Sequence, residues 1–284
     1  MKILHVAVFK PESTNVCQAE GFEHFGHHVY RFDYRRVATE LGSNLKRDDR
    51  LIEVCQSYKP DIILFSKCNK MDSIVIDACN KVGKTVLWFM DNFHSLDGEL
   101  REKMKKVDHV VCTTRKSVDV AKSLGADAHR LTGGFDPKIH KPLGLHQFRK
   151  ATFIGNTHPY RKPYLREVTE IVQHTNVHNE AHCKLVNESC ININFTEGDG
   201  VSNRIYKIMG AGGFLLTNKW NEMEEDFNAG VELVTFDTAQ ELKDKIKYYL
   251  ENKKVRDKIA LAGCVKARQR DNINYARRIL EICS

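Results

Sequence analysis

The sequence predicts an α/β protein built from two domains, each with a mainly parallel β-sheet. Short, continuous apolar runs, typical of buried parallel strands, recur along its 284 residues. Helix-patterned polar segments separate these runs, and a Gly- and Pro-rich stretch, GGFDPKIHKPLG (133–144), divides them into two series. Alternating strands and helices indicate βαβ units, so each series is expected to form one Rossmann-like domain.

The first series predicts an N-terminal domain over residues 1–142. It opens with the buried run KILHVAVF (2–9), after which Ser13 or Thr14 can cap a helix that ends before Gly26. Further strands are expected at 28–34, 61–66, 85–91 and 109–114. Helices are expected between them, at 47–58, 72–82, 97–106 and 116–124.

The second series predicts a smaller domain over residues 143–284. Strands are expected at 151–156, 190–195, 213–217 and 231–236. Helices are expected at 160–174, 179–188, 202–209, 238–252, 255–269 and 274–282. The final segment, 270–284, can cross back and pack on the first domain.

Composition narrows the class of protein. The chain is 42% hydrophobic and 29% charged, which is ordinary for a globular protein, and no apolar run approaches the ~20 residues of a membrane span. The start resembles a first strand rather than a signal peptide, so a cytoplasmic location is expected. Nine Cys without a C-x-x-C pair argue for reduced, buried thiols rather than disulfides or a zinc ribbon.

The net charge of +7 is unevenly distributed. Residues 101–150 contain 12 Lys and Arg against 5 Asp and Glu. Such an excess can recruit a polyanion such as DNA, but acidic residues interleave with the basic ones, which favours solvated helix faces. The chain has no G-x-x-x-x-G-K-[ST] motif, which excludes a P-loop NTPase. The first strand is not followed by G-x-G-x-x-G, which argues against an NAD dehydrogenase.

The most informative segment is EGDGVSNRIYKIMGAGGFLLTN (197–218). A Gly-rich loop leads into a short helix, where unpaired backbone amides and the helix dipole can hold an anion. Arg204 and Lys207 are three residues apart, so one helix face presents both cations. This pattern suits a diphosphate, although a plain helix–strand connection would carry similar glycines.

Several blocks together carry a family resemblance. They are F-I-G-N (153–156) followed by Arg161, I-N-I-N (191–194), the run 200–217, and E-D-F-N-A-G-V-E-L-V-T-F (225–236). In this order and spacing the C-terminal half resembles CgeB-like (spore-maturation type) glycosyltransferases of the GT-B fold. The first half is similar more loosely, in its strand–STN–helix start, WFMDN (88–92) and GGFDP (133–137).

The resemblance implies two Rossmann-like domains facing a cleft and sugar transfer from a nucleotide-sugar, most often a UDP-sugar. It also implies that no metal or other cofactor is needed. Arg and Lys side chains and helix-terminal amides would then stabilise the leaving diphosphate. Arg204 and Lys207 are the catalytic candidates in the second domain. The donor-binding candidates are Gly155, Asn156, Arg161, Asp199, Gly200, Val201, Ser202, Asn203 and Tyr206.

One position departs from the wider family pattern. Retaining GT-B enzymes often carry Glu, seven residues, Glu, and the second Glu holds the donor ribose. The matching residues are Asp199 and Lys207. A Lys cannot accept hydrogen bonds from ribose hydroxyls, so we expect Lys207 to join Arg204 in the phosphate site.

The first domain offers acceptor-side candidates. Asp91 follows a strand and could contact the acceptor or act as a base, or it could only shape a turn. Ser13, Thr14, Asn15 and Asn92 are further candidates near strand ends. Retention of the anomeric centre is expected by analogy. Hexosyl or pentosyl transfer, transfer to a hydroxylated DNA base, non-catalytic binding of a nucleotide-sugar, and epimerisation are the alternatives left open.

Overall fold

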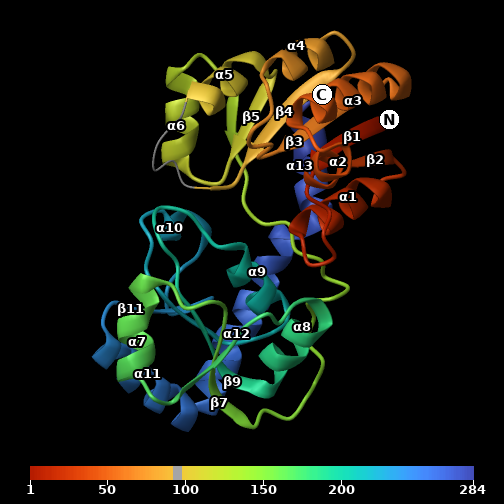
Figure 1. Cartoon of the computed structure of the whole chain (residues 1–284). Helices are drawn as coiled ribbons and strands as arrows, with labels where there is room; N and C mark the ends of the chain where they lie inside the picture. Colours follow the sequence, from red (N-terminus) through yellow and green to blue (C-terminus); the bar gives the residue numbers. More distant parts are fainter. Residues whose placement is uncertain (92–97) are drawn as a thin grey trace. The chain divides into compact units, whose positions relative to one another are not determined.

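A computed structural model describes residues 1–91 and 98–284. The chain forms two compact units (Figure 1). The first comprises Met1–Gly134 together with Asn272–Ser284, and the second comprises Phe135–Asp271. Each unit is a parallel-sheet α/β domain, which confirms the expected fold class.

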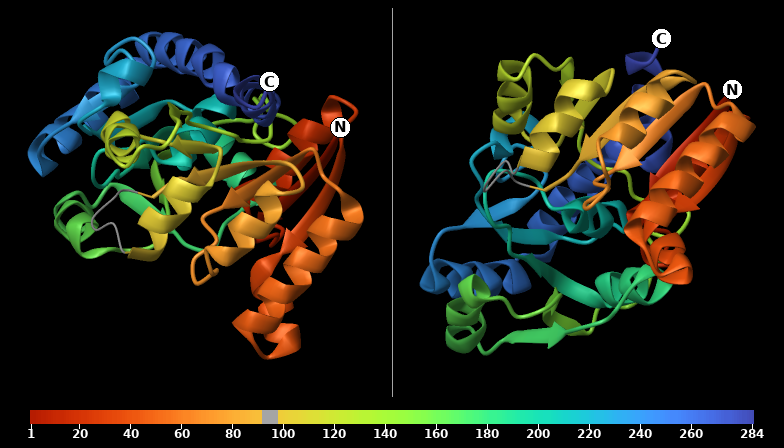
Figure 2. Two further views of the ribbon diagram at one scale, coloured as in Figure 1. Left: turned by 90° about the horizontal axis from the view of Figure 1, so that it is seen from above. Right: turned by 45° about the horizontal axis from the view of Figure 1, so that its top comes forward.

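The first unit contains a six-stranded parallel sheet in the order β2-β1-β3-β4-β5-β6. Its strands, red to yellow-green, run side by side in Figure 2. They are β1 (Lys2–Ala7), β2 (His28–Asp33), β3 (Ile62–Ser66), β4 (Lys84–Phe89), β5 (His109–Cys112) and β6 (Ala128–Arg130). The helices are α1 (Thr14–His24), α2 (Tyr34–Leu41), α3 (Asn44–Tyr58), α4 (Ile74–Asn80), α5 (Gly98–Lys106), α6 (Arg115–Ser123) and α13 (Asn272–Ile282).

Successive strand residues point to opposite faces of this sheet, and both faces are buried. Leu4, Ile63 and Leu87 face the core formed with helices α2–α6. Ile3, Leu64 and Val86 face the opposite core, which α1 and α13 complete. A parallel sheet covered on both faces requires continuous apolar strands, which is the pattern that the sequence shows.

The C-terminal helix α13 packs on the first unit, as the fold prediction expected. Asn272 Nδ2 donates to the Cys17 carbonyl oxygen over 2.8 Å, and Lys84 Nζ donates to that of Cys283 over 2.7 Å. The Tyr275 ring lies 5.2 Å from that of Trp88. The chain therefore closes the first unit with residues from both of its ends.

The second unit contains a five-stranded parallel sheet in the order β11-β10-β9-β7-β8. The strands are β7 (Arg149–Ile154), β8 (Ile171–His174), β9 (Ser189–Asn194), β10 (Leu215–Asn218) and β11 (Val234–Phe236). The helices are α7 (Lys162–Glu167), α8 (Asn179–Glu188), α9 (Asn203–Gly210), α10 (Met223–Asp226), α11 (Ala239–Glu251) and α12 (Lys253–Ala267). Short 3₁₀ turns, Pro159–Arg161 and Arg268–Arg270, precede α7 and follow α12.

The structure differs from the sequence prediction in two elements of this unit, the short helix α10, which was not expected, and the strand β8. The helix expected over 160–174 ends at Glu167, and β8 follows it. Ile171 and Val172 pair with Ala151 and Thr152 of β7. β-Branched residues beside an available parallel neighbour favour a strand, so tertiary context overrides the local helical pattern.

The boundary between the two units lies between Gly134 and Phe135. This is earlier in the sequence than residue 142, the boundary expected from the linker composition. Phe135 is fully buried and belongs to the core of the second unit. Its ring lies so close to α9 that a Cβ on Gly210 would stand 2.4 Å from Phe135 Cε2. The first half of the expected linker is therefore anchored by packing.

The expectations for the cysteines and for membrane spans can be compared with the structure. All nine Cys lie in the described part of the chain and are free, and only Cys190 is not buried. Among the described residues, no helix is long and apolar enough to cross a membrane.

Candidate functional site

The strand order of the second sheet contains a topological switch point between β7 and β9. The chain enters at β7, places β8 on one side and then β9 on the other. Crossover connections leave on opposite sides at such a switch point, and ligands bind outside the carboxyl ends of the strands there. Gly155 follows β7, and Asn194 ends β9.

Arg204 reaches this switch point from the first turn of α9. Its Nη1 donates to Asn194 Oδ1 over 3.2 Å. Its guanidinium also lies against the backbone of Gly155, where a Cβ would stand 3.1 Å from Arg204 Nη2. The two strand ends therefore hold this cation from both sides.

Arg161 supplies a second cation at the same place. It is buried, and its Nη1 donates to the Asn156 carbonyl oxygen over 2.7 Å. The guanidinium carbons of Arg161 and Arg204 lie 5.4 and 5.8 Å from the centre of the Phe153 ring. Burial, and then the charge of Arg161, lower the pKa of Arg204 to about 10.

Within residues 1–91 and 98–284, neither Arg161 nor Arg204 forms an ion pair with a carboxylate. Both side chains are guanidinium cations, so two partly desolvated positive charges repel one another. A bound anion would relieve that repulsion, so this corner of the sheet is suited to an anion.

Helix α9 adds its N-terminus to these cations. Ser202 has extended backbone and caps the helix, because its Oγ accepts from the Arg204 amide over 3.4 Å. The opposite face of α9, including Ile205 and Met209, is buried in the core and anchors the helix. Its first-turn amides and dipole therefore have a fixed direction.

A cavity of about 240 Å³ lies beside the start of α9. Arg204 and Lys207 line it from the same helix face, together with Ser202 and Asn203. The remaining lining residues are His140, Ile154, Val177, His178, Asn179 and His182. Among the described residues that line it there is no Asp or Glu. The cavity is therefore suited to an anionic ligand rather than to a metal held by carboxylates.

Two of the lining histidines are buried and neutral. Burial, with a contribution from the Lys207 charge, lowers the pKa of His140 to about 4. Burial also lowers the pKa of His182 to about 3, and the nearby cations add to the effect. Their ring centroids are 5.5 Å apart. In the described part of the chain, His140 Nε2 and both ring nitrogens of His182 have no hydrogen-bond partner.

The histidines were not expected from the sequence. His178 is the N-cap residue of α8 and His182 lies in the first turn of that helix, where the His182 amide donates to the His178 carbonyl oxygen over 3.2 Å. This four-residue spacing could have indicated the site. His140 lies in the segment interpreted as a linker. Its place in the cavity depends on the packing of Phe135 and its neighbours, which no local pattern reveals.

The other donor-binding candidates lie on the same side of the sheet or in the core. Asp199 is half-buried and its Oδ1 accepts from Asn221 Nδ2. Gly200 and Val201 are also half-buried in the loop before α9, and Asn156 is exposed. Tyr206 differs from these residues, because it is 1% exposed and its ring packs 5.6 Å from that of Phe227. Tyr206 therefore supports α9 from the core and does not line the cavity.

The acceptor-side candidates lie in the first unit. Ser13 caps α1 by accepting from the Asn15 amide over 3.3 Å, and Asn15 Nδ2 donates to the Val8 carbonyl oxygen over 3.1 Å. Thr14 is the first residue of α1. Asp91 Oδ2 forms an ion pair with Lys67 Nζ. Asn92 lies outside the described residues.

Comparison with curated proteins found no match. Among solved structures, a glycosyltransferase from Rickettsia africae ESF-5 matches with a TM-score of 0.74 and 12% identity, covering 99% of this chain and 97% of that one. Anabaena Alr3699/HepE, in complex with UDP-glucose, matches with a TM-score of 0.67 and 14% identity over 99% of both chains. Sucrose-phosphate synthase from Thermosynechococcus elongatus matches with a TM-score of 0.71 and 8% identity, covering 99% and 98%.

At these identities the likeness concerns the fold, and it confirms the GT-B architecture of two parallel-sheet domains. The family evidence comes from the sequence. A model of a family described as glycosyl transferase-like matches residues 138–284, which is more than half of the chain and includes every residue of the cavity. The protein therefore belongs to the glycosyl transferase-like family.

Proposed function

We propose that this protein transfers a sugar from a UDP-sugar to an acceptor, and that its second unit binds the donor. One observation carries the proposal. Arg204 is held at the switch point of the sheet, without a carboxylate partner among the described residues, beside a helix N-terminus and a cavity. The choice of UDP is supported by the Anabaena protein of the same fold, whose structure contains UDP-glucose.

The proposed catalysis depends on the negative charge that develops on the leaving diphosphate. When the sugar–phosphate bond breaks, the leaving diphosphate gains negative charge, and fixed positive groups lower the barrier most when they already point at it. Arg204, Lys207 and the first-turn amides of α9 supply such groups. We propose that they act in place of a metal ion, and that Arg161 adds to the positive potential.

The finer assignments rest on analogy. Retention of the anomeric configuration and a CgeB-like, spore-maturation type of enzyme are proposed from the sequence resemblance. Hexosyl transfer is proposed over pentosyl transfer because the Anabaena structure contains UDP-glucose. Asp91 and the Ser13–Asn15 turn are proposed as the acceptor side.

The excess of Lys and Arg in residues 101–150 does not support DNA as the acceptor. Lys103, Lys105 and Lys106 of α5 form ion pairs with Glu99, Glu102 and Asp77 respectively. These contacts neutralise the most concentrated part of the excess charge. DNA is therefore not proposed as the acceptor.

The decisive experiment incubates the full chain with UDP-, GDP-, CDP- and dTDP-sugars, with and without EDTA, and measures binding and nucleotide release. UDP-sugars should bind and, with water as the acceptor, release UDP slowly in EDTA. Arg204→Ala should lower turnover by roughly a hundredfold to a thousandfold, the range for losing one preorganised charge-stabilising donor. Lys254→Ala, which changes an exposed Lys of the same unit, is the matched control.

Three outcomes would count against the proposal. Binding of UDP-sugars without release of UDP, either to water or to a panel of added sugar acceptors, would indicate a non-catalytic relative. Release of an altered sugar without an acceptor would indicate an epimerase. Full activity in Arg204→Ala would remove the site on which the proposal rests.

A further inference from the structure

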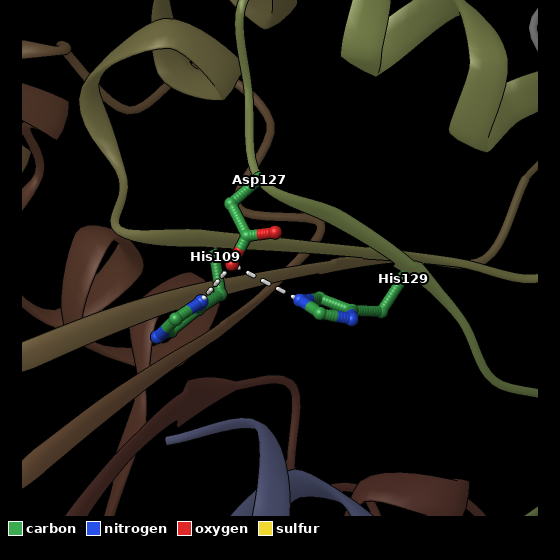
Figure 3. Close-up of side chains that lie close together, drawn as sticks. All are labelled: His109, Asp127 and His129. Carbon is green, nitrogen blue, oxygen red and sulfur yellow. Dashed lines mark hydrogen bonds and ion pairs between the residues drawn. The ribbon is translucent and has the colours of Figure 1, made fainter. Parts of the chain in front are cut away.

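Three side chains of metal-ligating types lie close together in the first unit (Figure 3), whereas the residues proposed to bind the donor belong to the second unit. The parallel register pairs Val111 of β5 with His129 of β6. Because strand residues alternate between faces, His109 and His129 share the face on which Val111 lies. Asp127, directly before β6, completes the group.

Both imidazoles point at one carboxylate oxygen, as Figure 3 shows. His109 Nδ1 lies 2.7 Å and His129 Nε2 lies 3.1 Å from Asp127 Oδ2.

We propose that His109, Asp127 and His129 bind a divalent transition-metal ion, with Zn²⁺ as the best match. Two imidazole nitrogens and one carboxylate oxygen form a borderline donor set of the kind found in zinc sites. Ca²⁺ and Mg²⁺ prefer shells made of oxygen ligands alone.

The spacing needs little adjustment to accept the ion. Tetrahedral Zn²⁺ with bonds of about 2.0–2.1 Å separates its ligand atoms by roughly 3.3 Å. The observed separations of 2.7 and 3.1 Å are shorter by about 0.6 and 0.2 Å, and all three ligand atoms lie within 4.8 Å of one another, so side-chain rotation can bring them to these distances. Asp127 is 57% exposed, so a water molecule can reach the fourth position.

The competing interpretation is a carboxylate that accepts hydrogen bonds from two neutral imidazoles. In that arrangement the ring nitrogens carry protons, whereas a metal needs their lone pairs. Among residues 1–91 and 98–284, this is the group of at least three His, Cys, Asp or Glu side chains that meets metal-ligand spacing. Metal uptake distinguishes the two interpretations. A metal site binds the ion through these three side chains, whereas a purely hydrogen-bonded group does not.

The position of the group indicates what the ion would do. β6 is a three-residue edge strand, paired on one side by β5. The group lies at the amino-terminal side of these strands, whereas substrates of parallel sheets bind at the carboxyl ends. The ion would thus tie β6 to β5 and stabilise the first unit, independently of whether the proposed transferase activity is correct.

The test uses the full chain without a histidine tag, stripped with a chelator and titrated with ZnCl₂ by calorimetry. A parallel titration with CoCl₂ is read by the visible absorption of low-symmetry Co²⁺. We expect saturable uptake in both titrations and displacement of the Co²⁺ spectrum by Zn²⁺. Zn²⁺ should raise Tm and slow amide exchange in β6.

His129→Ala and Asp127→Asn should each lower the affinity by at least roughly tenfold, whereas the exposed control His146→Ala should leave it unchanged. Asp127→Asn changes an exposed side chain, so it keeps the test valid if His129→Ala does not fold. The proposal is overturned if the parent protein takes up no metal. It is equally overturned if both variants bind Zn²⁺ with the affinity and stoichiometry of the parent.

Discussion

The guanidinium of Arg204 packs against the backbone of Gly155, so closely that a Cβ at Gly155 would stand 3.1 Å from Arg204 Nη2 and 3.0 Å from Phe153 Cζ. Gly155, which follows β7, therefore contacts Arg204 in the first turn of α9. The F-I-G-N block and the Gly-rich run, which are far apart in the sequence, form one site through this contact.

Gly155→Ala should displace Arg204 and weaken donor use while the fold persists. We expect a roughly tenfold rise in KM for the donor, because a loss of about 1.4 kcal/mol from a charged contact corresponds to that factor. Steady-state kinetics and Tm measure the two effects separately. Gly98→Ala is the control, since a Cβ there meets nothing within 4 Å. Unchanged kinetics in Gly155→Ala would show that the Arg204 position is not critical.

Lys207→Ala should raise the dissociation constant for UDP by roughly tenfold to a hundredfold, because a hydrogen bond to a charged group contributes about 1.5–3 kcal/mol. Lys207→Glu should weaken binding further, since it reverses a charge beside Arg204 in the same cavity. Calorimetry with UDP measures both variants, and Lys254→Glu controls for net charge. Tighter binding by Lys207→Glu would instead show that the family's ribose-binding pattern is still accommodated.

Asp91→Asn should impair transfer to an acceptor without changing donor affinity, because Asp91 lies in the first unit and the residues proposed to bind the donor lie in the second. We expect turnover to fall by roughly a hundredfold, the lower part of the range for a positioned acid–base group. Lys67→Met breaks the ion pair of Asp91 but keeps the carboxylate, so it should retain most transfer. Equal transfer by Asp91→Asn and the parent would leave Asp91 with a structural role only.

Stability should fall with acidification below pH 6.5. Burial holds the folded-state pKa of His140 at about 4 and that of His182 at about 3, both below the ordinary 6.5. As the pH falls from 6.5 toward these values, the unfolded chain binds protons that the folded chain does not, so the free energy of unfolding decreases. Each group contributes a slope of up to about 1.4 kcal/mol per pH unit.

Urea unfolding at several pH values measures that slope. His182→Gln should reduce the pH dependence of the free energy of unfolding by the contribution of one proton between about pH 6 and 4. This holds whatever effect the substitution has on absolute stability. The exposed His146→Gln should leave the pH dependence unchanged. An identical slope in His182→Gln and the parent would mean that His182 is protonated in the folded protein.

Gly21→Ala should loosen the packing of α13 on α1. A Cβ at Gly21 would stand 2.2 Å from the Asn272 carbonyl oxygen, which belongs to the backbone and cannot rotate away. Overpacking costs about 1–3 kcal/mol and exceeds the gain in helix propensity of about 1 kcal/mol. Denaturation and amide exchange in α13 measure the effect, with Gly98→Ala as control. Unaltered exchange in α13 would contradict the close packing.

Local patterns in the sequence were sufficient for most elements of both sheets. Buried parallel strands must be apolar on both faces, so runs such as DIILFS (61–66) and TVLWFMD (85–91) correspond to β3 and β4 with small shifts at their ends. The strand β8 was interpreted as helix, because its identity depends on the neighbouring β7, which lies far from it in the sequence.

The same division holds for the candidate site. The sequence by itself placed Arg204 and Lys207 on one face of a helix after a Gly-rich loop, because helix spacing and glycine content are local properties, and it thereby predicted an anion-binding segment. Only the tertiary structure brought Gly155 and Asn194 to Arg204, buried His140 and His182 beside Lys207, and placed Tyr206 in the core. These relationships depend on strand order and on the packing of segments distant in sequence, and no local pattern encodes the side on which a crossover connection leaves a sheet.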